Sequence, residues 1–126
     1  MLNSLLKNTT DIYIAYGATD FRKQIWSLYS DIKENFNIDA CKANTAFIFC
    51  NKKRTSIKVL CYDKNGFILA QKTLLNKDNM KFNWPKNRGE LDKITHEQLR
   101  WLLTGLSIFQ KKSFSEIDIN NIEILN

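Results

Sequence analysis

A β-hairpin pattern in the middle of the chain limits the folds open to this sequence. Residues 56–62 alternate between two sets of side chains, as a strand does, and residues 67–74 form a second strand-like run. Asn65-Gly66 lies between them, and both residues tolerate the positive φ of a tight hairpin turn. A short aromatic run at 46–50 and a polar connection at 51–55 precede them. The sequence therefore predicts an antiparallel meander whose first turn is a basic tip.

Two helices are predicted on either side of this meander. Thr19 or Asp20 is expected to cap a helix that continues to residue 36, following a strand at 11–16. Its apolar stripe recurs at helical spacing and consists of Phe21, Ile25, Leu28, Ile32 and Phe36. Thr95 and Gln98 form a capping box that begins a second helix near 95–106.

The remaining segments complete the predicted architecture. A further short strand is expected at 80–84, ended by Pro85, and residues 86–93 are expected to form a surface loop. The tail comprises residues 107–126, and its part at 111–126 is expected either to add an edge strand to the sheet or to extend freely from the domain. The prediction is a single α+β domain over residues 1–126, with an antiparallel sheet of four or five strands packed against two helices.

Bulk properties exclude several classes of protein. The chain has 126 residues, 44% of them apolar and 25% charged, which are ordinary globular values. It has no apolar run near the roughly 20 residues needed to span a bilayer, and the composition of its first ten residues leads us to expect no secretion. Its three cysteines, Cys41, Cys50 and Cys61, form neither a disulfide framework nor a C-x-x-C pair. A reducing cytoplasm is the expected location.

The positive charge is confined to one segment. Residues 42–88 hold eleven Lys or Arg against two acids, a net +9, whereas the rest of the chain is −3. Such a concentration favours a polyanionic partner, although a solvated basic surface is the alternative. The expected phosphate contacts are the tip, its flanking strands and the start of the first helix: Lys52, Lys53, Arg54, Lys58, Lys72 and Arg22.

Catalytic or metal chemistry is not expected. The single histidine, His96, has no partner residues that indicate a metal site or a nucleophile, and the isolated glycines form no phosphate loop. The plausible carboxylate trio for metal-dependent phosphoryl chemistry is Asp20, Asp63 and Glu97. A helix cap is the favoured role for Asp20, and a turn is the favoured role for Asp63. Trp84 is expected to pack in the core, with an exposed stacking contact as the alternative. No cofactor, metal or membrane contact is predicted.

Several motifs occur together in an order that is typical of one family. They are Thr19-Asp20-Phe21-Arg22-Lys23, residues 46–54, residues 57–63, Asn65-Gly66-Phe67, Lys72-Thr73-Leu74, Phe82-Asn83-Trp84-Pro85, and Thr95 with Gln98-Leu99, Leu102-Leu103 and Gly105. Over residues 11–106 the chain resembles TnpB, the small second-reading-frame product of IS-sixty-six type insertion sequences, which is distinct from the RNA-guided nuclease of the same name. The family usually has Lys-Arg-Leu where this chain has Lys72-Thr73-Leu74, and Gly where it has Gln24.

The resemblance implies a role in transposition beside a separate transposase that carries the catalytic acids, and often beside a small helix-turn-helix protein. It supplies no catalytic residue. The expected function is that of a non-enzymatic accessory protein that binds DNA, such as the element ends, through its basic hairpin surface. The alternative is a protein-interaction subunit of the transposase complex that does not touch DNA.

Overall fold

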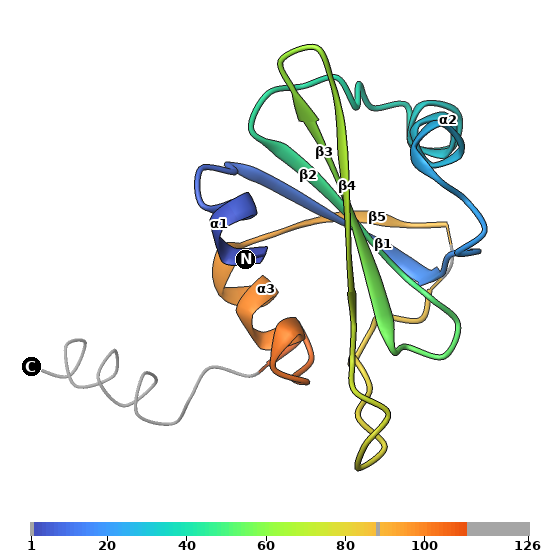
Figure 1. Cartoon of the computed structure of the whole chain (residues 1–126), viewed down its shortest axis with the longest axis vertical. Helices are drawn as coiled ribbons and strands as arrows, with labels where there is room; N and C mark the ends of the chain where they lie inside the picture. The colour runs from blue at the N-terminus through green and yellow to red at the C-terminus, as the bar shows by residue number, and fades with distance from the viewer. Residues whose placement is uncertain (1, 88, 111–126) are drawn as a thin grey trace, which may run out of the picture.

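A computed structural model describes residues 2–87 and 89–110 of the chain, and Figure 1 shows its arrangement. Within these residues, three helices and five strands follow one another as α1 (Leu2–Leu6), β1 (Asp11–Ala18), α2 (Ile25–Phe36), β2 (Thr45–Cys50), β3 (Ser56–Asp63), β4 (Gly66–Thr73), β5 (Leu91–Ile94) and α3 (His96–Leu103). No helix in this part of the chain has the length and apolar character required to cross a membrane.

The five strands form one open sheet in the order β4-β3-β2-β1-β5. Strands β2, β3 and β4 are the predicted antiparallel meander, which confirms the α+β class. One pair differs from the prediction of an antiparallel sheet, because β1 runs parallel to β2. The reason is the connection: α2 carries the chain back from the end of β1 to the start of β2, as a parallel pair requires.

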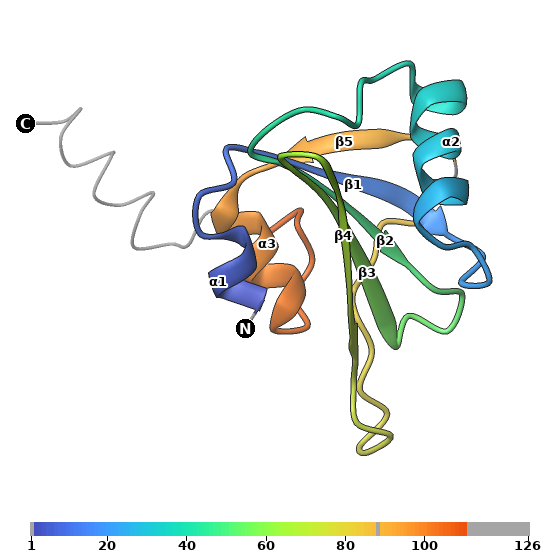
Figure 2. The same cartoon turned by 45° about the horizontal axis from the view of Figure 1, so that its top comes forward.

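Helices cover both faces of the sheet, so two apolar clusters form. Figure 2 shows α2 on one side of the sheet and α1 with α3 on the other. Leu28 and Ile32 of α2 pack in a cluster with Leu60 of β3, whereas Val59 belongs to the cluster beneath α1 and α3. Neither face of β3 is solvated along most of its length, and Lys58 in its centre is buried as well.

Helix α2 begins later than predicted. Its first residue is Ile25, and its N-cap is Gln24, whose side chain makes no capping hydrogen bond. The prediction that Thr19 or Asp20 caps the helix is therefore wrong. Asp20 instead accepts hydrogen bonds from Arg22, which gives it a partner in the connecting segment. The stripe residue Phe21 lies outside the helix but still packs on the cluster beneath α2.

The two hairpin turns lie close to their predicted positions. Asp63 pairs with Gly66, so the β3–β4 loop consists of Lys64 and Asn65. Lys64 adopts the left-handed conformation at φ 52°, and Gly66 does not. The Asn-Gly pair therefore sits one residue later in the turn than the sequence pattern suggested, because the ladder extends to Asp63. The β2–β3 turn spans 51–55, as predicted.

The segment between β4 and α3 departs from the prediction. Residues 80–84 form no strand, whereas β5 overlaps the end of the expected surface loop at 86–93 and pairs with β1. The four residues of β5 carry too short an apolar pattern to be recognised without their neighbour. Trp84 is buried, and its indole N–H donates to the carbonyl oxygen of Ala15 over 2.8 Å, which confirms the core role.

Helix α3 has the predicted capping box. The Thr95 hydroxyl accepts from the Gln98 amide at 3.1 Å, and the Gln98 side chain accepts from the Thr95 amide at 2.9 Å. The helix ends at Leu103, three residues earlier than predicted, and Leu106 is about half exposed. Residues 107–110 are irregular, and residues 111–126 of the tail lie outside the described part of the structure.

Candidate nucleic-acid interface

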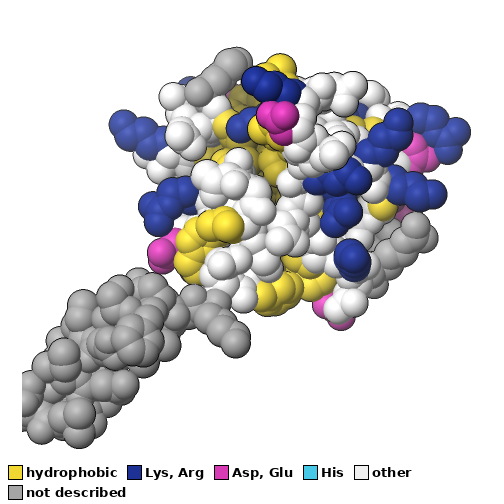
Figure 3. All heavy atoms as spheres, turned by 90° about the horizontal axis from the view of Figure 1, so that it is seen from below, with side chains coloured by type: hydrophobic (Ala, Val, Ile, Leu, Met, Phe, Trp, Pro, Cys, Tyr) yellow, Lys and Arg dark blue, Asp and Glu magenta, His cyan; other side chains and the backbone are white. Residues whose placement is uncertain are grey.

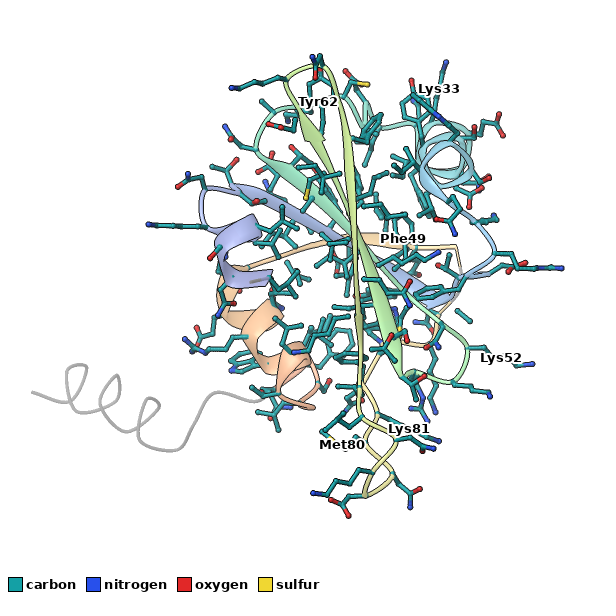
Figure 4. The ribbon with its side chains drawn as sticks, in the orientation of Figure 1. Lys33, Phe49, Lys52, Tyr62, Met80 and Lys81 are labelled. Atoms are coloured by element: carbon teal, nitrogen blue, oxygen red, sulfur yellow. The ribbon has the colours of Figure 1, made fainter. Side chains whose placement is uncertain are left out.

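The β2–β3 turn is built around the side chain of Asn51. Its Oδ1 atom accepts hydrogen bonds from the amides of Thr55 at 2.8 Å and Ser56 at 3.0 Å, and its amide nitrogen donates to the Thr55 hydroxyl. The turn therefore presents Lys52 and Lys53 as exposed side chains. Figure 4 shows Lys52 extending away from the body of the molecule.

The segment between β1 and α2 supplies the second part of the site. The Arg22 guanidinium donates hydrogen bonds to the carboxylate oxygens of Asp20, from Nε at 3.0–3.1 Å and from Nη2 at 2.6 Å. The Arg22 side chain is nevertheless 92% exposed. Hydrogen bonds from Arg22 lower the pKa of Asp20 to about 2, and the same bonds raise the pKa of Arg22. Next to it, the Lys23 ammonium pairs with Asp31 of α2 at 2.5 Å.

These two segments meet around a hollow of about 920 Å³. Arg22 and Lys23 line one wall, with Asp20 and Asp31, and Lys52 and Lys53 line another. A smaller adjoining hollow of about 250 Å³ is lined by Arg54 and Lys86, together with Lys52 and Trp84. We call the cations of the two hollows the basic end: Arg22, Lys23, Lys52, Lys53, Arg54 and Lys86.

The basic end lies on one side of the molecule. Figure 3 views the lower end of Figure 1 and shows more Lys and Arg side chains on one half of that face than on the other, where further Lys or Arg groups also lie. Six cations against the two carboxylates that line the same hollows leave an excess of positive charge. Low-dielectric walls focus such a field, so the surface favours an anionic partner.

Four of the six predicted contact residues come together at this end. Arg22 lines the larger hollow with Lys52 and Lys53, although it is about 30 residues away from them in the sequence, and Arg54 lines the adjoining hollow. Lys72 does not join them. It lines a separate hollow of about 740 Å³ with residues of α1 and α3, on the opposite face of the sheet. Lys72 is therefore no part of the basic end.

Lys58 is also excluded from the surface. It is 3% exposed, and its ammonium donates to the carbonyl oxygens of Phe21 at 2.9 Å and Lys23 at 2.8 Å. Burial lowers the pKa of this lysine. An ammonium held inside the fold is not available to a phosphate, so the prediction of a direct contact by Lys58 is corrected.

The basic segment of the sequence is divided between two ends of the sheet. Lys42 lies near the start of β2, 3.4 Å from Asp11, and Lys64 lies in the β3–β4 turn, both away from the β2–β3 turn. Conversely, the basic end includes Lys23, from outside the segment, and Lys86. The sequence signal for Lys23 was the exposed edge of the first helix, and the signals for Lys86 were its place in the basic segment and its position after Pro85.

The carboxylates considered for phosphoryl chemistry lie in separate places. Asp20 is bonded to Arg22, Asp63 closes the β3–β4 hairpin, and Glu97 lies 3.6 Å from Arg100 on α3. His96 is exposed, and its Nε2 atom lies 2.6 Å from the Thr9 carbonyl oxygen. Across residues 2–87 and 89–110, no three His, Cys, Asp or Glu side chains are placed to hold a metal ion.

Fold and site together define a small α+β protein with a two-sided core and one cationic end. The sequence profile described as IS66 Orf2 like protein matches residues 10–113, and the chain belongs to this family. This confirms the resemblance seen in the motifs and gives the protein an accessory role in IS66 transposition.

A relative from Sinorhizobium fredii (strain NBRC 101917 / NGR234), described as uncharacterized protein y4hO, is 32% identical over 95 residues. The alignment covers 75% of this chain and 79% of the relative. No solved structure matches the chain.

Proposed function

We propose that this accessory protein binds duplex DNA through the basic end and assists a separate transposase. The DNA that it binds is the ends of the insertion element. The observation that carries the proposal is the convergence of Arg22 with the β2–β3 turn across one cationic hollow. Each phosphate that a Lys or Arg neutralises releases condensed counterions, which gives affinity without base readout. On this proposal the protein performs no chemistry and works in the cytoplasm, beside the transposase and a small helix-turn-helix protein.

The test is a salt titration of duplex binding with two double variants. Lys52→Ala with Lys53→Ala removes exposed cations of the basic end, whereas Lys33→Ala with Lys64→Ala removes two exposed lysines elsewhere. Figure 4 labels Lys33 and Lys52 well apart. We expect the first variant to bind at least ~10-fold more weakly in ~0.1 M salt and to flatten the slope of log affinity against log salt by about 2. The second variant should bind like the native protein.

The protein-interaction alternative is supported by a separate exposed aromatic group. Trp26 of α2 is 71% exposed, and its ring packs edge-on against Tyr29 and Phe67, each at a centroid distance of 6.0 Å. Exposed Trp and Tyr are typical of protein contact surfaces.

Three outcomes separate the possibilities. Failure of the native protein to bind any duplex, combined with co-purification of transposase that Trp26→Ala abolishes, would favour the interaction subunit. Equal loss of affinity in both lysine pairs would contradict an interface at the basic end. Metal-dependent DNA cleavage lost in Asp20→Asn would indicate an enzyme instead.

A further inference from the structure

A lysine side chain lies inside the fold at the centre of strand β3. Lys58 pairs with Phe49 of β2 on one side and Gln71 of β4 on the other, and it is 3% exposed. A buried ammonium is unfavourable unless hydrogen bonds replace its lost water. Because Lys58 is buried, its charge cannot serve the solubility of the surface, and its hydrogen-bond partners indicate its role.

All the described contacts of this ammonium lead to one segment. Its Nζ atom donates to the carbonyl oxygens of Phe21 and Lys23 and lies 4.8 Å from the centroid of the Phe21 ring. The two carbonyls flank Arg22, so the lysine binds the backbone on both sides of that residue. The cation–π contact holds the preceding ring in place as well.

The segment held in this way has little regular structure of its own. Residues 19–24 lie between β1 and α2 and belong to neither element. Inside the segment, the hydrogen bonds are those from Arg22 to Asp20 and one from the Lys23 amide to the Asp20 carbonyl at 3.1 Å. At its ends, the Thr19 amide donates to the Cys50 carbonyl at 2.8 Å, and the Lys23 ammonium pairs with Asp31. Without a fixed backbone, the exposed Arg22 side chain would have no defined position relative to the β2–β3 turn.

We infer that Lys58 is a positioning residue, which from inside the fold fixes the backbone at Phe21 and Lys23 and so aims Arg22 across the basic end. The effect of Lys58 on DNA binding rests on the proposed function. Its role in fixing the backbone around Arg22 does not depend on DNA. Lys58 touches no DNA. Its charge is directed at peptide carbonyls, and it acts on the partner only through Arg22.

Hydrogen exchange tests the geometric part without any DNA. In Lys58→Met we expect the amides of Arg22 and Lys23 to exchange about 10-fold faster, while the amides of Val59 and Ile48 keep their native rates. A merely structural role would accelerate all four amides together, as general destabilisation does. Native protection of Arg22 and Lys23, or a uniform change at all four amides, would overturn the inference.

A duplex-binding cycle tests the functional part. Lys58→Met and Arg22→Ala should each weaken binding and flatten the salt slope by about 1, and the double variant should bind no more weakly than Arg22→Ala alone. Native-like binding by Lys58→Met, or independent losses that multiply in the double variant, would overturn it. If the native protein binds no duplex, the proposed function fails, while the exchange rates still decide the role of Lys58.

A second variant covers the case in which Lys58→Met does not fold. Lys58→Gln keeps amide donors but is too short to reach both carbonyls, so the same local loss of protection is expected. Protection of Arg22 and Lys23 at the native level in this variant would equally overturn the inference.

Discussion

At the scale of single residues, the surroundings of a charged side chain decide its role. Arg22 and Lys58 are both cations predicted to contact phosphate, yet one is 92% exposed at its side chain and the other is buried. Asp20 was expected to cap a helix and instead forms a bidentate pair with Arg22. Residue type alone indicated that these positions carry charged side chains. It did not indicate whether each side chain points to solvent or into the fold.

The Asp20–Arg22 pair leads to a prediction about pH. The carboxyl of Asp20 should titrate with a pKa of about 2 in the folded protein, below the ~3.9 of an unfolded chain. Because the folded pKa is the lower one, the pair stabilises the fold above the unfolded value. That contribution is lost as the pH falls from about 4 through about 2.

Carboxyl chemical shifts measured across this pH range would report the titration of Asp20. Arg22→Ala should return the pKa of Asp20 toward the ordinary value, whereas Arg100→Ala on α3 should leave it unchanged. An Asp20 pKa that is the same with and without Arg22 would contradict the assigned cause.

At the scale of elements, local sequence signals predicted most of the helices and strands. They missed the elements whose formation depends on pairing with a segment that is distant in the sequence. The meander of β2, β3 and β4 and the capping box of α3 follow from alternation and from side-chain chemistry within a few residues. The strand β5 could not be predicted, because its pairing with β1 joins residues about 80 positions apart. The parallel β1–β2 pair likewise depends on the path of α2.

The capping box of α3 gives a stability prediction. Thr95→Ala removes the hydroxyl that accepts from the Gln98 amide at 3.1 Å, so one amide of the first turn loses its partner. We expect the free energy of unfolding to fall by about 1 kcal/mol, measured by urea denaturation.

The matched control is Ser30→Ala, an exposed position inside α2. This change should alter the free energy of unfolding by no more than about 0.5 kcal/mol. Equal losses in the two variants would show that the cap does not contribute specifically.

At the scale of the whole molecule, helices cover both faces of the sheet. As a result, two of the three thiols are buried and one is exposed. Cys41 is exposed, whereas Cys50 and Cys61 are buried in the cluster beneath α1 and α3. Burial raises the pKa of Cys50 to about 12 and that of Cys61 to about 11, so neither forms a thiolate at neutral pH.

Thiol labelling should therefore report the opening of the fold. With an aromatic disulfide reagent at neutral pH, one thiol should react rapidly and two slowly, and the slow rate should rise with denaturant. Cys41→Ser should abolish the rapid phase alone. Rapid reaction of all three thiols in the native protein would contradict the two-sided core.

The basic end is also a property of the whole molecule. The sequence showed that residues 42–88 are strongly cationic, but the fold sends Lys42 and Lys64 to the far end and Lys72 to the opposite face. It then adds Arg22 and Lys23 from the segment before α2. Four of the six cations of the basic end were predicted contacts: Arg22 and the three cations of the β2–β3 turn. Lys23 and Lys86 were not among them, because their approach to the turn depends on contacts between segments far apart in the sequence.

Amino-acid order alone determined the elements whose signals are short in range: the alternating strands, the hairpin turns, the apolar stripe of α2 and the cap of α3. It also carried the family motifs. Tertiary structure decided which strands became neighbours, which charges met at the basic end and why Lys58 is buried. The physical reason is that the periodicity of apolar residues is a local property of each helix or strand. Burial and the clustering of charges depend on contacts between residues that are far apart in the sequence.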